Sequence, residues 1–132
     1  MIVEDNDADV FLIQEALAGT GLRIELEILL DGEQAIDFFE RVEHDPDLSC
    51  PTLIILDINL PKKQGGEVLK QIRRGPKCSA APVLVVSTSD SQPDRERMAS
   101  LGADGYFRKP SEYEEFMKLG AIAKKWLGPQ SS

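Results

Sequence analysis

Hydrophobic residues along the chain follow three patterns: short continuous runs, one alternating stretch, and stripes that recur every three or four residues. Continuous runs at 53–56 and 82–86 are typical of central parallel strands, which are covered on both faces. Alternating residues at 23–29 predict a half-buried strand near a sheet edge. Two shorter apolar runs, at 1–3 and 105–108, predict the remaining strands.

Helical stripes fill the intervals between these strands. One covers about residues 7–18, with Asp7 as its predicted N-cap, and a second begins at Asp31-Gly32. Three more are predicted around 68–72, 91–101 and 116–127. Five strands that alternate with five helices predict an α/β fold, a doubly wound parallel sheet with helices on both faces. We expect residues 1–132 to form one domain of ordinary size.

The net charge of the chain argues against two classes of binding partner. A formal net charge of −8 argues against binding to nucleic acid or to anionic membranes, which attract basic surfaces. No apolar run approaches the roughly 20 residues that span a bilayer, and acids interrupt the N-terminus where a signal peptide would be apolar. We therefore expect a cytoplasmic protein without membrane contact.

The two cysteines and the single histidine limit the chemistry further. Cys50 and Cys78 lie far apart in the sequence, no CxxC motif is present, and His44 is the only histidine. These counts do not support a zinc site, a Cys/His nucleophile pair or a serine-hydrolase triad. For a chain of this composition we expect both cysteines to be free thiols.

Residues with useful chemistry follow the predicted strands. Glu4 and Asp5 follow the first, Asp57 the third, Ser87 the fourth and Lys109 the fifth. Ligands of open parallel sheets bind at the carboxyl ends of strands, so we expect these side chains to meet at one edge. Clustered carboxylates repel one another unless a cation lies between them, and oxygen ligands suit Mg²⁺. A carboxylate beside Mg²⁺ can attack phosphorus, while a lysine and a hydroxyl stabilise the phosphoryl oxygens.

At this point the sequence resembles the response-regulator receiver family of two-component systems, most closely single-domain regulators of the cyanobacterial-phytochrome type. The resemblance covers nearly the whole chain in order. It implies a flavodoxin-like sheet with strand order 2-1-3-4-5. The matching segments are Val3–Asn6, Leu56–Pro61, Gly65-Gly66, Val86–Thr88, Gly102-Ala103 and Lys109-Pro110.

The resemblance also implies a role for each site residue. Asp57 would accept a phosphoryl group from a sensor histidine kinase or a histidine phosphotransfer protein. Asp5 and Asp57 would bind Mg²⁺ directly, with Glu4 assisting and Asn59 contributing its backbone carbonyl. Ser87 and Lys109 would contact the phosphoryl group, and a cis Lys109-Pro110 bond would aim the lysine at it.

The same resemblance implies a switch. On phosphorylation Ser87 would move toward the phosphate and Tyr106 would turn inward, changing the surface around the fourth and fifth helices. We expect a stand-alone regulator that signals through protein contacts, including a phosphorylation-sensitive homodimer. It would catalyse its own phosphorylation and dephosphorylation without being primarily an enzyme. The first strand is shorter than the family usually has, so either upstream residues are missing or the strand is shortened.

Other interpretations of these residues remain open. Glu4 to Asp7 could be a solvated acidic run that caps the first helix, and Tyr106 could be ordinary core packing. Gly65-Gly66 more simply starts a helix than cradles phosphate. Three other functions compete: a receiver-like module that is never phosphorylated, a flavodoxin-like cofactor binder, and a dehalogenase-type phosphatase. The phosphatase class typically has a second aspartate where this chain has Asn59, and no phosphate-cradling loop supports the cofactor binder.

Overall fold

The computed structural model describes residues 1–60, 62 and 64–127, and it contains a five-stranded parallel sheet in the order β2-β1-β3-β4-β5. The predicted strand order is therefore confirmed. Pro61 of the matching segments, Lys63 and the tail 128–132 lie outside the described residues. The strands are β1 (Ile2–Val3), β2 (Ile28–Leu29), β3 (Ile54–Asp57), β4 (Val83–Ser87) and β5 (Gly105–Arg108).

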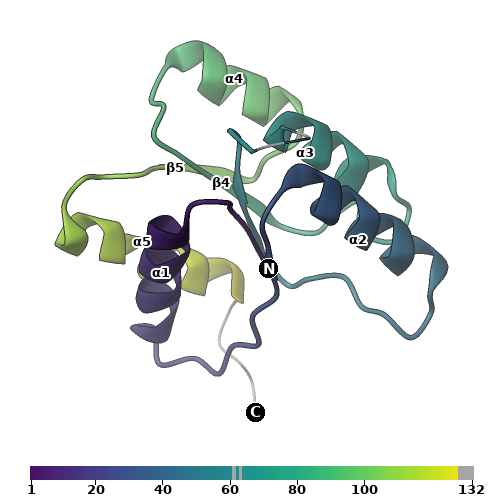
Figure 1. Ribbon diagram of the computed structural model, residues 1–132, viewed down its shortest axis with the longest axis horizontal. Coiled ribbons are helices and arrows are strands. Elements are labelled where there is room, and N and C mark those ends of the chain that lie inside the picture. The colour runs from purple at the N-terminus through teal and green to yellow at the C-terminus, as the bar shows by residue number, and fades with distance from the viewer. Residues whose placement is uncertain (61, 63, 128–132) are drawn as a thin grey trace.

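The five predicted helices are present and lie on two faces of the sheet (Figure 1). The first and last helices cover one face, because their buried side chains share a core with alternate residues of the strands. The second, third and fourth cover the other face through a second core. Their bounds are α1 (Asp7–Ala18), α2 (Gly32–His44), α3 (Gly65–Arg74), α4 (Gln92–Ser100) and α5 (Tyr113–Leu127).

Strand burial follows the hydrophobic pattern. All four residues of β3 and all five of β4 are buried, as their continuous apolar runs predicted. Strand β2 is shorter than predicted, since only Ile28–Leu29 of the alternating stretch pairs with β1. Strand β1 contributes two residues, so it offers few pairing positions to the upstream part of that stretch. Of the alternating apolar residues, Ile24 and Ile28 pack against the core, but Leu26 is 39% exposed, so the pattern overstated both the burial and the length of this strand.

Two local predictions need correction. Asn6 caps α1, because its side chain accepts a hydrogen bond from the backbone N–H of Asp9, so the N-cap lies one residue before Asp7. The described residues contain no cis peptide bond, so the Lys109-Pro110 bond is trans. The trans form is the intrinsically favoured one before proline. The backbone N–H of Lys109 instead donates to the carbonyl of Ser87 at 2.6 Å, and this fixes the chain where β5 ends.

The prediction of free cysteines is wrong in the structure, where Cys50 and Cys78 form a disulfide. Their Cα atoms are 5.6 Å apart, within the usual range for a disulfide. Cys50 lies in the loop that enters β3, and Cys78 lies in the loop that enters β4. Because β3 and β4 are parallel neighbours, the residues that precede them meet at the amino edge of the sheet. Sequence separation alone did not reveal this proximity.

Candidate functional site

The strand-end residues singled out by the sequence meet at the carboxyl edge of the sheet. Asp57 is the last residue of β3 and pairs in register with Val86 of β4, one residue before Ser87. Ser87 pairs in turn with Arg108 of β5, one residue before Lys109. The parallel register therefore brings the ends of three neighbouring strands together, as expected for this class of sheet.

Three carboxylates form a close group at this edge. Glu4, Asp5 and Asp57 each present an oxygen, and these atoms all lie within 4.8 Å of one another. Glu4 and Asp57 are only 1% and 7% exposed, whereas Asp5 is exposed to solvent. Two buried negative charges next to a third are unfavourable without a cation. The arrangement therefore favours a positive group among the three oxygens.

The Lys109 ammonium supplies one positive charge. Its Nζ lies 2.6 Å from Oε1 of Glu4, 2.8 Å from Oδ2 of Asp9 and 3.5 Å from Oδ2 of Asp57. The lysine side chain is only 7% exposed. Burial by itself would lower the pKa of Lys109, but its bonds to Asp9 and Glu4 and the nearby charge of Asp57 raise that pKa above its usual value. The ammonium therefore stays charged at neutral pH.

Glu4 is the most constrained of the carboxylates. Its Oε2 accepts hydrogen bonds from the backbone N–H groups of Asp5 and Asn6, at 3.1 and 3.2 Å. Burial, together with a hydrogen bond to Asp57, raises the pKa of Glu4 from 4.5 to about 7, although Lys109 acts in the opposite direction. Because these partners already engage both oxygens of Glu4, it is less free than Asp5 to take a new ligand.

The backbone after β3 shapes the surroundings of Asp57. The N–H of Asn59 donates to Oδ1 of Asp57 at 3.1 Å, which orients the carboxylate. Gly65, the first residue of α3, lies against the same turn, and a Cβ built there would collide with the Asp57 carbonyl oxygen. The pair Gly65-Gly66 thus begins a helix, as the simpler interpretation held. Gly65 also permits that helix to start close beside Asp57.

The serine-rich loop between β4 and α4 is hydrogen-bonded to the aromatic residue of β5. Ser87 is fully buried, and its Oγ accepts a hydrogen bond from the N–H of Ser89 at 3.1 Å. The Tyr106 hydroxyl donates to the carbonyl of Ser89 at 2.8 Å, so Ser89 lies between the two predicted switch residues. The Arg95 guanidinium covers the Tyr106 ring at 4.5 Å from its centroid. Tyr106 is half-buried and packs against the core beneath α3 and α4.

The donor set fits a hard divalent cation such as Mg²⁺. Such ions prefer carboxylate and carbonyl oxygens and retain bound waters, which suits a group with one exposed member. Asp5 and Asp57 are the residues best placed to bind the ion directly. Glu4 is placed to assist from the buried side, since its oxygens already bind Lys109 and two backbone N–H groups.

One residue of the site escaped the sequence interpretation. Nothing in the sequence distinguishes Asp9 from the other acids near the N-terminus, yet it provides the second short bond to Lys109. The helical pattern places residue 9 in the first turn of α1, but the sequence does not show that this turn faces a lysine one hundred positions later. The contact depends on the docking of α1 against the sheet edge.

Comparison with known proteins places this geometry in a family. Residues 1–120 match the response regulator receiver domain model. The chain is 37% identical over 129 residues to a probable methanogenesis regulatory protein, FilR2 of Methanothrix harundinacea, covering 97% of this chain and 83% of that protein. It is 36% identical over 128 residues to the response regulator Rcp1 of Synechocystis, covering 96% of this chain and 87% of Rcp1.

Solved structures agree. The phosphorylated cyanobacterial phytochrome response regulator RcpA superposes with a TM-score of 0.86 at 37% identity, covering 96% of this chain and 91% of that one. The Mn²⁺-bound form of Rcp1 gives 0.84 at 35% identity, covering 99% and 94%. Among the described residues, none of the helices has both the length and the apolar character needed to cross a bilayer. The fold, the strand-end chemistry and these similarities together show that the chain belongs to the response regulator receiver domain family.

Proposed function

We propose that the protein is a response regulator receiver whose Asp57 accepts a phosphoryl group with the help of Mg²⁺. The observation that carries this proposal is the position of the Asp57 carboxylate. It is nearly buried at the end of β3, lies within 4.8 Å of two other carboxylates, and has the Lys109 ammonium 3.5 Å away. This arrangement combines a nucleophile, ligands for a divalent cation and a fixed positive charge.

In the proposed reaction an oxygen of Asp57 attacks the phosphorus of a phosphohistidine on a kinase or phosphotransfer protein. A P–O bond to Asp57 forms, the P–N bond breaks, and the imidazole nitrogen retains the electron pair. The product is an aspartyl phosphate, whose hydrolysis by water returns the free carboxylate and inorganic phosphate. When bound, Mg²⁺ neutralises charge on the phosphoryl oxygens.

The protein's own residues have separate roles in this proposal. Asn59 orients Asp57 through its backbone N–H and would offer its backbone carbonyl to the ion. Lys109 would neutralise one phosphoryl oxygen as a point charge. The hydroxyl of Ser87 would donate to another, after exchanging its present contact with the N–H of Ser89.

The signalling part of the proposal concerns the surface beside Tyr106. Ser89 contacts both Ser87 and Tyr106, so a movement of Ser87 toward a phosphoryl group would displace the acceptor of the tyrosine hydroxyl. We expect the result to be a changed contact surface around α4, β5 and α5 and phosphorylation-dependent binding, to a partner or to a second copy of the chain. A cytoplasmic location and one receiver unit over residues 1–132 belong to the same proposal.

The test is labelling by a small phosphoryl donor. Wild-type protein incubated with Mg²⁺ and acetyl phosphate should gain one phosphoryl group by intact mass, and chelating the metal should abolish the gain. Asp57→Asn should remain unlabelled, while Asp47→Asn, at an exposed loop position, should label like wild type. An unlabelled wild type, under conditions that label another receiver, would contradict the proposal. Labelling of Asp57→Asn would contradict the residue assignment.

A further inference from the structure

Lys109 is held by more carboxylates than the proposed chemistry uses. Its two shortest contacts are to Glu4 and Asp9, at 2.6 and 2.8 Å, whereas Asp57 lies at 3.5 Å. Glu4 belongs to the three-carboxylate group, but Asp9 does not. Asp9 therefore has a different relation to the lysine from that of the residues expected to meet a metal ion.

The Asp9 carboxylate is held on a rigid element. It lies in the first turn of α1, where the side chain of Asn6 accepts a hydrogen bond from the Asp9 backbone N–H at 3.0 Å. Negative side chains are favoured in this turn, because the helix dipole places partial positive charge there. The Asp9 side chain is 23% exposed, so most of its surface is shielded from water. Its position is fixed by helix packing and capping.

Glu4 is the less independent partner of Lys109. Its other oxygen accepts two backbone hydrogen bonds, and it lies among the metal-ligand candidates. An ammonium has three N–H donors, so Lys109 can keep a bond to Asp9 while another donor points toward Asp57. The lysine stem reaches across the sheet edge from the end of β5. A long flexible side chain in such a place needs a fixed acceptor to hold its charge in one position.

Resting on the proposed phosphotransfer, we infer that Asp9 is a positioning residue that anchors the Lys109 ammonium beside Asp57. The inferred role is to keep the positive charge in place before the phosphoryl group arrives, so that little reorganisation is needed in the transition state. Asp9 itself does not touch the reacting atoms. Its loss should lower the maximal rate of phosphorylation more than it changes the donor concentration that gives half the maximal rate.

Two readouts test this role, and Asp7 offers a matched control. Asp7 lies in the same first turn and is exposed, so Asp7→Ala removes the same charge without removing the lysine contact. With Mg²⁺ and acetyl phosphate, Asp9→Ala should lower the maximal labelling rate by up to about a hundredfold relative to Asp7→Ala, the loss that a catalytic group misplaced by about 1 Å can cause. Asp9→Asn retains a neutral acceptor and should lose less than Asp9→Ala.

The second readout observes the lysine directly. In a proton–nitrogen NMR spectrum of lysine ammonium groups, Lys109 should give a slowly exchanging signal, assigned by its loss in Lys109→Arg. That signal should survive in Asp7→Ala and broaden or disappear in Asp9→Ala, with or without Mg²⁺. Because this measurement needs no phosphoryl donor, it remains informative if labelling fails.

The outcomes separate the two proposals. Equal labelling rates for the two alanine variants, with an unchanged Lys109 signal, would overturn the role of Asp9 and leave the function of Asp57 intact. Equal losses in Asp9→Asn and Asp9→Ala would also overturn it, because they would indicate an effect of charge alone. A wild type that never labels but shows the anchored Lys109 signal would contradict phosphotransfer while preserving the contact itself.

Discussion

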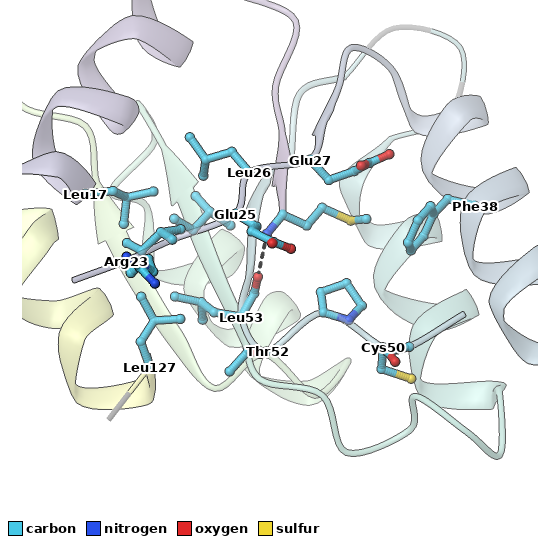
Figure 2. A pocket seen from close by; sticks show the side chains of 15 residues that line it. Leu17, Arg23, Glu25, Leu26, Glu27, Phe38, Cys50, Thr52, Leu53 and Leu127 are labelled. Carbon is cyan, nitrogen blue, oxygen red and sulfur yellow. Dashed lines mark hydrogen bonds between the residues drawn. The ribbon is translucent and has the colours of Figure 1, made fainter. Parts of the chain in front are cut away.

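The two edges of the sheet are held together by different physical means. At the carboxyl edge Lys109 joins buried carboxylates that come from separate elements. At the amino edge a disulfide links the loops before β3 and β4, and the Met1 ammonium donates to the carbonyl of Leu53 at 2.9 Å. That edge also contains a cavity of about 520 Å³, lined by side chains including Arg23, Leu53 and Leu127 (Figure 2).

The carboxyl edge holds the candidate site residues, whereas the amino edge stabilises the fold without contributing to that site. Charge placed in a buried site is costly to isolate, so the carboxyl edge depends on every partner remaining present. The amino edge holds its loops with a covalent link that requires no complementary charge. We therefore expect a change at the carboxyl edge to lower the free energy of unfolding more than a change at the amino edge, and three measurements test this expectation.

The largest effect is expected from Lys109→Met in the absence of divalent cations. At pH 8 this change leaves Glu4 and Asp57 buried and close together without a cation, so the free energy of unfolding should fall by about 3–5 kcal/mol. Urea unfolding provides the measurement. Lys118→Met removes a surface pair with Glu115 in which the lysine is 66% exposed, and it should change the value by less than about 1 kcal/mol. Similar small losses of unfolding free energy in both variants would show that the Lys109 charge does not stabilise the carboxyl edge.

The next effect concerns the disulfide at the amino edge. Reduction should lower the free energy of unfolding by about 3 kcal/mol, because the link closes a loop with a sequence separation of 28 and restricts the unfolded chain. Thermal or urea unfolding with and without reductant measures it. The double variant Cys50→Ala/Cys78→Ala should not respond to reductant. Free thiols in the untreated protein, detected by a thiol reagent, would contradict the disulfide and restore the interpretation from sequence.

The smallest effect is a pH dependence at the amino edge. Burial lowers the pKa of the Met1 ammonium from 8.0 to about 6, and the charge of Glu27 only partly opposes this. Between these values the unfolded chain binds more protons than the folded one, so stability rises with pH from about 6 to about 8 and is lost as pH falls. For the chain that begins at Met1, the gain should be about 2 kcal/mol.

Acetylation of the amino group isolates this contribution, because it removes the titrating group while other groups continue to titrate. The difference in unfolding free energy between free and acetylated protein should therefore vary over that pH range. A pH-independent difference would show that the ammonium is solvated in the folded state. Taking this difference also cancels the contribution of Glu4. Its pKa is raised from 4.5 to about 7 in the folded protein, so its ionisation lowers stability as the pH rises, opposite to the effect of the Met1 ammonium.

The fold was largely predictable because continuous apolar runs in the sequence indicate which strands are buried. The continuous runs that became β3 and β4 and the helical stripes fixed the order of elements, and the acids and the lysine directly follow strands. The length of β2 was not predictable, because it is limited by the two-residue strand β1 with which it pairs. The Cys50–Cys78 disulfide and the role of Asp9 depend on how segments pack in space.

For the individual site residues, their proximity was predictable, whereas their roles are still untested. The structure brings Glu4, Asp5 and Asp57 together and places Lys109 among them, as the strand-end rule predicted. The phosphoryl transfer, the contribution of the Asn59 carbonyl and the switching of Ser87 and Tyr106 stay predictions. They depend on groups and movements that hydrophobic periodicity does not encode.

The bond between Lys109 and Glu4 joins residues that are 105 positions apart. During synthesis on the ribosome, Glu4 and Asp57 emerge long before the lysine that pairs with them. When β1 and β3 pair, these carboxylates come together without their lysine until β5 has docked. The lysine contact can therefore form only late in synthesis, after β5 has emerged, and a chain truncated before residue 109 lacks it.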